Sequence, residues 1–97
     1  MKLLTKALAK KIPALYAQDG KGDQAIAYAK FFTPDANFTW FVTELDQETG
    51  ECFGLVAGLE RELGYFTIGE LEKIRGRFGL PVERDRWFEP KPLAECR

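Results

Sequence analysis

AIAYAKFFTPDANFTWFVTELDQETGECFGLVAG, residues 25–58, contains three runs rich in aromatic and β-branched residues, separated by two turn signals. In the first turn, between AIAYAKFFT and FTWFVTEL, Pro34 presets the backbone and Asp35 or Asn37 tolerates the turn geometry. The second turn, DQETGE with Gly50, leads into the third run, CFGLVAG. Three such runs joined by short turns predict an antiparallel β-meander.

The middle run carries apolar bulk on both sides of the predicted sheet. Because side chains alternate along a strand, one face receives Phe38, Trp40 and Val42, and the other receives Thr39, Phe41 and Thr43. We therefore expect a helix to cover one face, and the other face to be partly covered or left for a partner.

A helix is predicted before the meander. Thr5 is a suitable N-cap, and the apolar residues after it recur at helical spacing: Leu8, Ile12, Leu15 and Tyr16. Pro13 interrupts this pattern, because proline removes a hydrogen-bond donor and crowds the preceding turn, so the helix kinks or restarts there. The amphipathic pattern predicts that the apolar stripe packs on the sheet.

The second predicted helix, near residues 68–76, follows the meander. Thr67 and Glu70 match the T-x-x-E capping box, and Phe66 and Leu71 occupy the positions of a hydrophobic staple. The apolar stripe of this helix comprises Ile68, Leu71, Ile74 and Phe78, and Gly76 or Gly79 ends it.

The C-terminal stretch VERDRWFEPKPL alternates in a way that predicts a final edge strand. Pro90 and Pro92 then forbid regular pairing and favour an extended tail that is frayed from about residue 93. Together these elements predict one globular domain over residues 1–97. Its class is α+β, with an antiparallel meander of three to four strands, an N-terminal helix and a second, capped helix.

Charge is unevenly distributed along the chain, whose net charge is −1. Residues 1–30 hold six Lys and two Asp, residues 35–72 hold one Arg and nine acids, and residues 73–97 hold seven basic and four acidic residues. An ordinary mixed surface explains this pattern, and two faces of opposite sign that meet a charged partner are the alternative. The low net charge disfavours nonspecific nucleic-acid binding driven by overall charge.

Two cysteines that lie far apart, Cys52 and Cys96, favour a reduced, cytoplasmic protein. Lys6 and Lys10 fall where a signal peptide needs its apolar region, so no signal peptide is expected. The longest apolar runs are far shorter than the roughly 20 residues that span a bilayer, so no membrane partner is expected either.

The residue types exclude the most familiar catalytic machinery. The chain has no histidine and no serine, which removes Ser-His-Asp triads, Cys-His pairs and histidine-dependent zinc sites. Glu44, Asp46, Glu48 and Glu51 remain as candidates for carboxylate catalysis or Mg²⁺ binding, but a polar turn commonly carries acids and their spacing matches no metal loop. We therefore expect no enzyme activity and no cofactor.

One charged cluster with a tryptophan forms the candidate interaction site: Arg75, Arg77, Glu83, Arg84, Asp85, Arg86 and Trp87. One interpretation is a nucleic-acid site, in which the arginines bind phosphate and rings such as Phe38, Trp40 and Phe41 stack on bases. The competing interpretation is that the rings form the core and that Arg84 and Arg86 pair with nearby acids. A protein interface uses the same residue types, because Trp, Tyr and Arg are frequent in binding hot spots.

Three stretches carry a specific resemblance: KFFTPD with the following TW, GLERELGYFTIGELEKIRG, and GLPVERDRWFEPKPL. Through them the chain, from about Lys2 to Leu93, resembles the bacterial family known as domain of unknown function 2958. The resemblance implies no established activity and no catalytic residues. It implies an accessory protein carried by plasmids, conjugative elements and prophages.

The residues and the resemblance together lead us to expect a noncatalytic accessory protein of a mobile genetic element. Its expected partner is a protein, for example a host defence or DNA-processing enzyme that it inhibits. Direct nucleic-acid binding through the region from Arg75 to Arg86 is the alternative function. The sequence sets no expectation for the oligomeric state.

Overall fold

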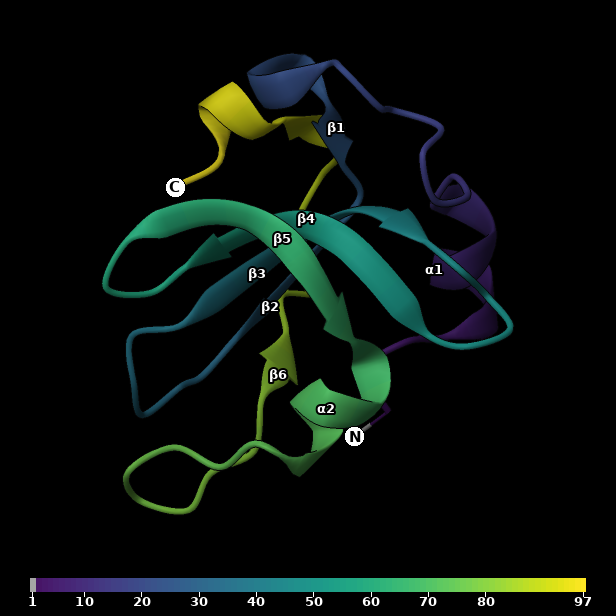
Figure 1. Ribbon diagram of the computed structural model, residues 1–97. Helices are drawn as coiled ribbons and strands as arrows, with labels where there is room; N and C mark the ends of the chain where they lie inside the picture. Colours follow the sequence, from purple (N-terminus) through teal and green to yellow (C-terminus); the bar gives the residue numbers. More distant parts are fainter. Residues whose placement is uncertain (1) are drawn as a thin grey trace.

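The computed structural model describes residues 2–97 and has the predicted α+β architecture (Figure 1). Its helices are α1 (Lys6–Lys11), the 3₁₀ helix η1 (Gly22–Gln24), α2 (Ile68–Lys73) and the 3₁₀ helix η2 (Leu93–Glu95). Its strands are β1 (Ile26–Ala27), β2 (Ala29–Phe32), β3 (Thr39–Leu45), β4 (Glu51–Ala57), β5 (Arg61–Thr67), β6 (Glu83–Arg84) and β7 (Lys91–Pro92). None of the helices in residues 2–97 has the length and apolar character needed to span a membrane.

Strands β2 to β6 form one antiparallel sheet in the order β5-β4-β3-β2-β6. The meander is confirmed as β2, β3 and β4, and the C-terminal stretch supplies an edge strand, β6, of only two residues. The prediction of three to four strands missed β5, whose sequence RELGYFT lacks a clear apolar alternation. As a border strand with mostly exposed residues, β5 needs no continuous apolar run.

The first predicted strand divides into β1 and β2, and β1 leaves the main sheet. β1 pairs antiparallel with β7, with Ile26 opposite Pro92. The expectation that Pro90 and Pro92 forbid regular pairing is therefore wrong for Pro92. Proline lacks a backbone N–H, but a ribbon of two residues per strand needs few hydrogen-bond donors. A hydrogen bond from Leu93 N–H to the Ala25 carbonyl (2.9 Å) continues the ribbon past Pro92.

The C-terminal tail packs on the molecule, in contrast to the fraying expected from about residue 93. Leu93 and Cys96 are each 2% exposed. Arg61 of β5 donates a hydrogen bond from Nη2 to the carbonyl oxygen of Cys96 (2.9 Å). The tail therefore covers part of the sheet face that carries Phe41.

Strand β3 contributes to two hydrophobic cores, one on each face of the sheet. Trp40 and Val42 belong to the larger core, with residues from the N-terminal segment, β2, β4 and α2. Phe41 belongs to a smaller core built with β1, β4 and the tail. A β-bulge between Val42 and Glu44 shifts the alternation, so Leu45 returns to the larger core. Both faces are thus covered at the centre of the sheet.

Helix α1 begins as predicted, with Thr5 Oγ1 accepting a hydrogen bond from Leu8 N–H (3.1 Å). It ends before Pro13, and Ile12, the residue after its last turn, is buried in the larger core. The predicted apolar stripe does not reach Tyr16, which is 66% exposed with φ of 72°. The reason is that the chain is extended at Ile12, so the helical spacing stops there.

Helix α2 begins with the predicted capping box. Thr67 Oγ1 accepts from Glu70 N–H (3.0 Å), and Glu70 Oε1 accepts from Thr67 N–H (3.1 Å). The staple residues Phe66 and Leu71 are both buried in the larger core. The helix ends at Lys73, before the predicted end near residue 76, and Phe78 is 78% exposed.

Candidate functional site

The seven candidate residues fall into two groups in the structure. Arg75 and Arg77 lie in the loop 75–81 that follows α2, whereas Glu83 to Trp87 lie in β6 and the segment after it. The contacts of each side chain show which of the seven residues hold the fold together and which are available to a ligand.

Loop 75–81 is held in place by Asp35, from the turn between β2 and β3. Asp35 Oδ2 accepts hydrogen bonds from the N–H groups of Phe78 (2.7 Å) and Leu80 (3.3 Å). Gly76 lies directly against the same carboxylate, where a Cβ atom would overlap Oδ1. Sequence reasoning gave Asp35 only a turn role, because no local pattern links it to a loop 43 residues away.

Arg75 completes the C-terminal end of α2. Its Nη1 donates hydrogen bonds to the carbonyl oxygens of Glu72 (3.0 Å) and Ile74 (2.9 Å). A helix leaves its last carbonyl groups without partners, so this guanidinium acts as a cap. A bridge between Arg75 and Pro81 closes the loop. Arg75 is therefore a structural residue in this arrangement.

Arg84 fastens the N-terminal segment to β6. Its Nη1 donates hydrogen bonds to the carbonyl oxygens of Lys2 (3.0 Å) and Leu3 (2.7 Å). The Leu3 side chain is 1% exposed and belongs to the larger core. One interpretation of the sequence paired Arg84 with nearby acids, but in the structure its guanidinium binds backbone carbonyl groups.

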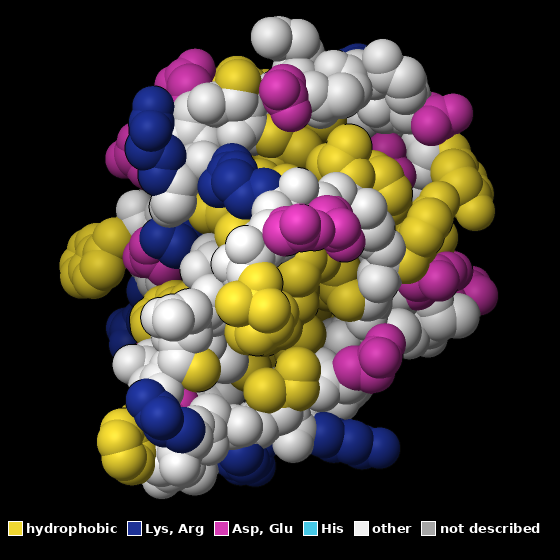
Figure 2. All heavy atoms as spheres, turned by 60° about the vertical axis from the view of Figure 1, so that its left-hand side comes forward, with side chains coloured by type: hydrophobic (Ala, Val, Ile, Leu, Met, Phe, Trp, Pro, Cys, Tyr) yellow, Lys and Arg dark blue, Asp and Glu magenta, His cyan; other side chains and the backbone are white. Residues whose placement is uncertain are grey.

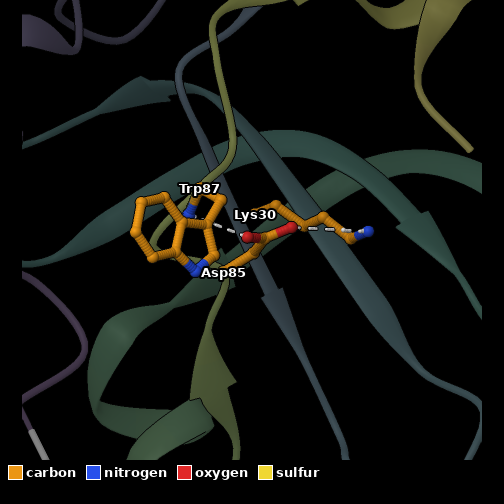
Figure 3. A network of polar contacts seen from close by, with 3 residues as sticks. All are labelled: Lys30, Asp85 and Trp87. Carbon is orange, nitrogen blue, oxygen red and sulfur yellow. Dashed lines mark hydrogen bonds and ion pairs between the residues drawn. The ribbon is translucent and has the colours of Figure 1, made fainter.

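Asp85 connects the segment after β6 to β2. Its N–H donates to the carbonyl oxygen of Lys30 (2.9 Å), which continues the β2–β6 pairing. Its Oδ1 accepts from the backbone N–H of Trp87 (2.9 Å), and its Oδ2 lies 3.8 Å from Lys30 Nζ (Figure 3). Figure 3 shows the Asp85 carboxylate between the Lys30 ammonium group and the indole of Trp87. The backbone of Trp87 is fixed, while its side chain is 91% exposed.

An open groove lies between the β2–β3 hairpin and the segment after β6, and we call it the Trp87 groove. Its volume is about 670 Å³, and its lining combines aromatic, small polar and charged side chains: Lys30, Phe32, Thr33, Ala36, Asn37, Phe38, Thr39, Arg84, Asp85, Arg86 and Trp87. Lys30 is paired with Asp85, and Arg84 is bound to backbone groups. Arg86 is the basic side chain of the groove that makes no hydrogen bond or ion pair within residues 2–97.

A second hollow, of about 440 Å³, adjoins the Trp87 groove at Phe38. Two turns and Arg77 line it: Pro34, Asp35, Ala36, Asn37, Phe38, Gly58, Leu59 and Arg77. Phe38 is 43% exposed and stacks on Trp40 with ring centroids 5.8 Å apart, and Leu59 is fully exposed. We call the groove and this hollow together the turn-end surface. Figure 2 shows the side of the molecule that carries these turns, where hydrophobic side chains gather among both acidic and basic ones.

The acidic candidates for carboxylate chemistry are engaged within the fold. Glu44 is 3% exposed, and its two carboxylate oxygens accept hydrogen bonds from the N–H groups of Tyr16 and Gln18 (both 2.7 Å). Asp46 Oδ1 accepts from Glu48 N–H (2.9 Å) inside the turn between β3 and β4. Across the part of the chain that the structure describes, no group of three or more potential ligands gathers as a metal site would require.

Both cysteines are buried and unpaired in residues 2–97. Burial, and to a smaller extent the neighbouring Glu51 carboxylate, raises the pKa of the Cys52 thiol to about 12. Burial also raises the pKa of Cys96, while Lys91 opposes this effect. Raised pKa values keep both thiols protonated, which is the opposite of an activated nucleophile.

The architecture and this surface define a small α+β protein, built on a five-stranded antiparallel sheet with a Trp- and Arg-bearing groove at one end. The chain belongs to the family described as protein of unknown function DUF2958, whose model matches residues 3–95. No curated protein and no solved structure matches the chain.

Proposed function

We propose that this protein is a noncatalytic accessory protein that binds another protein through the turn-end surface. The observation that carries the proposal is the exposed indole of Trp87 beside a groove that also exposes Phe38. Isolated exposed apolar residues are common on proteins, but a contiguous apolar surface rimmed by polar groups marks an interaction site. Here Phe38 links the Trp87 groove to the hollow that holds Leu59.

The composition of the turn-end surface matches that of binding hot spots. Trp and Arg are enriched among the residues that contribute most to protein–protein affinity, and such residues cluster near the centre of an interface. Trp87 and Arg86 are neighbours on the Trp87 groove, and both are exposed. Because Asp85 fixes the Trp87 backbone, little backbone entropy is lost when a partner covers the ring.

The local charge favours a protein partner over nucleic acid. Binding to a phosphate backbone depends on several basic side chains that each neutralise a phosphate. In the Trp87 groove, Asp85 pairs with Lys30 and two backbone carbonyls hold Arg84 in place, which leaves Arg86 there and Arg77 in the adjoining hollow as the basic side chains without such contacts among the described residues. Arg75 is held at the end of α2 by two carbonyl groups, so its guanidinium is not free to follow a phosphate backbone.

The proposed partner is a component of a host cell that a mobile genetic element enters. The resemblance to a family carried by plasmids, conjugative elements and prophages motivates this part of the proposal. A host defence enzyme or a DNA-processing enzyme is the class of protein that such an element gains from inhibiting. Blocking a partner by occupying its surface needs an interface and no catalytic group.

The test is affinity capture from host cells, with nuclease treatment, using the wild type and Trp87→Ala. We expect the wild type to recover a companion protein in near-stoichiometric amount. Trp87→Ala should lose it, because removal of a hot-spot residue costs about 2 kcal/mol or more, which is roughly a 30-fold loss in affinity. Equal recovery with both proteins, or recovery of nucleic acid in place of a protein, would overturn the proposal.

Tyr16→Ala provides the matched control. Tyr16 is an aromatic residue that is 66% exposed, and it lies beside Glu44 at the end of β3 away from the Trp87 groove. Its removal should leave capture of the companion unchanged. Thermal unfolding of both variants shows whether loss of binding reflects the surface or the stability of the fold.

A further inference from the structure

We propose that strand β5 is a self-association strand, through which two copies of this chain pair edge to edge in antiparallel orientation. The two five-stranded sheets would then continue into one sheet of ten strands. This surface is separate from the turn-end surface, and the inference is independent of the function proposed above. It rests on the length, exposure, hydrogen-bonding pattern and residue order of β5.

Strand β5 is an unusually open border of the sheet (Figure 1). It has seven residues, pairs with β4 in regular register from Arg61 to Thr67, and contains no proline and no bulge. On its outer side no strand pairs with it among the residues that the structure describes. Proteins normally protect a long, regular edge of this kind, because it is a template for pairing with another chain.

The backbone polar groups at this edge follow from the β4–β5 hydrogen bonds. Bonds join Gly58 N–H to the Glu60 carbonyl and Ile68 N–H to the Gly50 carbonyl, each at 3.0 Å. Antiparallel strands alternate between residues that bond to the neighbouring strand and residues that face away. The even-numbered residues of β5 therefore bond to β4, and the odd-numbered ones, including Leu63 and Tyr65, direct their N–H and C=O groups to the open edge.

The residue order of β5 is complementary to itself in one register. Pairing all seven residues of one strand with all seven of another places the two-fold axis at Gly64. Leu63 then lies opposite Tyr65 of the second copy, in hydrogen-bonded pairs on both sides of the axis. Leu63 is 46% exposed and Tyr65 is 54% exposed, so this register covers both apolar side chains. It also sets Glu62 opposite Phe66, which avoids opposing like charges.

Gly64 fits the position on the axis. Antiparallel strands approach most closely at pairs that are not hydrogen-bonded to each other, and two glycines make that approach free of side-chain contact. Within one chain, a Cβ atom at Gly64 would meet nothing within 4 Å. Its own fold therefore supplies no steric reason for glycine at this position, and in the proposed pair the position leaves the approach of the two strands unobstructed.

The other border of the sheet does not offer the same template. β6 has two residues, and Asp85 directly after it continues the pairing with β2 and then turns the chain away. The β1–β7 ribbon also has only two residues in each strand. β5 is the border with enough length for a second copy.

The first test measures the mass of the protein in solution by light scattering or sedimentation, from about 10 µM to about 1 mM, because small interfaces form weak complexes. We expect the wild type to shift with concentration from one chain to two. Tyr65→Lys should remain a monomer, because the pair would place an ammonium group from each copy beside the apolar Leu63 side chain of the other copy. Phe78→Lys, which also replaces an exposed aromatic ring but lies in loop 75–81, should behave as the wild type.

The second test uses a thiol on the axis. Gly64→Cys fits the single chain, and the proposed register brings the two new thiols face to face, so an added oxidant such as diamide should link them rapidly. Leu59→Cys, a fully exposed control in the β4–β5 turn, should link at least tenfold more slowly.

A wild type that stays monomeric at every concentration, a Tyr65→Lys variant that still dimerises, or equal linking rates would overturn the inference. If β5 instead pairs with a different protein, the wild type should stay monomeric at every concentration.

Discussion

Asp35 and Gly76 lie in direct contact although they are 41 positions apart in the sequence, and this contact fixes loop 75–81. The carboxylate binds two N–H groups of the loop and fills the space beside the glycine. No pattern of spacing or propensity reveals such a pair, because it exists only after the sheet has formed. The cap residues Thr5 and Thr67 were predictable, because each acts on an N–H group three residues away.

Gly76→Ala should destabilise the protein by about 1–3 kcal/mol, because overpacking displaces the Asp35 carboxylate and its hydrogen bonds. Urea denaturation measures the change. Gly69→Ala is the matched control, since its added Cβ meets only Thr67 Oγ1 at 3.9 Å and alanine favours a helix. Equal stability of the two variants would contradict the proposed role of Asp35.

The Cys52 thiol predicts a pH dependence of stability. Its pKa is raised from 9.0 to about 12, by burial first and by Glu51 second. Between these two values the unfolded chain loses the thiol proton while the folded chain keeps it. The free energy of unfolding should therefore fall as pH rises from 9 towards 12, by about 1.4 kcal/mol for each pH unit, with no contribution from Cys52 below pH 9.

Urea unfolding at several pH values across this window measures the slope. Cys52→Ala removes the titrating thiol, so its slope should be smaller by the contribution of one proton, even though the variant is less stable throughout. All other ionisable groups are common to the two proteins, so their contributions cancel in the comparison. Identical slopes for the two proteins would show that the buried thiol does not titrate in this way.

At the scale of elements, Arg84 and Arg86 lie two residues apart in the sequence and differ in what they hold together. Arg84 joins β6 to the N-terminal segment, whose Leu3 lies in the larger core. Arg86 lines the Trp87 groove. The sequence indicated a cluster of arginines near a tryptophan, but it did not distinguish these roles, because the carbonyl groups that bind Arg84 come from the opposite end of the chain.

Arg84→Gln should lower the free energy of unfolding by about 1–2 kcal/mol, because two charge-assisted hydrogen bonds are lost. Arg86→Gln should change it by less than about 0.5 kcal/mol, as expected for an exposed surface residue. Thermal or urea unfolding of the two variants makes the comparison. A similar loss in both, or in neither, would contradict the division between a structural and an available arginine.

The elements show which parts of the fold the sequence could predict. The strands of the meander and the capped helix follow from local residue patterns, and the structure confirms them. Strand β5 was missed, because RELGYFT is a border strand with only one buried residue, Phe66. β7 was missed because Pro92 argues against pairing, and only the position of β1 beside it makes a short ribbon feasible.

At the scale of the whole molecule, the two sheet faces are covered by segments that are distant in the sequence. The N-terminal segment and α2 contribute to one core, and the C-terminal tail contributes to the other. Of the two alternatives for the second face of the sheet, partial covering or a surface left for a partner, the structure shows covering by the tail of the same chain. The apolar side chains that remain exposed beside the candidate site lie at the end of the sheet: Phe38, Leu59 and Trp87.

The two tryptophans make this surface measurable without any substitution. Trp40 is 6% exposed and Trp87 is 91% exposed, so acrylamide quenching of the intrinsic fluorescence reports mainly on Trp87. Quenching is measured for the protein alone, with the captured companion protein, and with duplex DNA, single-stranded DNA and RNA. Salt is set at about 50 mM and about 200 mM, because binding to phosphate weakens steeply over this range.

We expect the companion protein to shield Trp87 from acrylamide in a saturable way at both salt concentrations, and the nucleic acids to leave quenching unchanged. Tyr16→Ala should give the same result as the wild type. Shielding by a nucleic acid at about 50 mM salt that disappears at about 200 mM would rule out a protein partner as the main ligand and assign the surface to phosphate binding. Undiminished quenching in the presence of the companion would show that its binding site lies elsewhere.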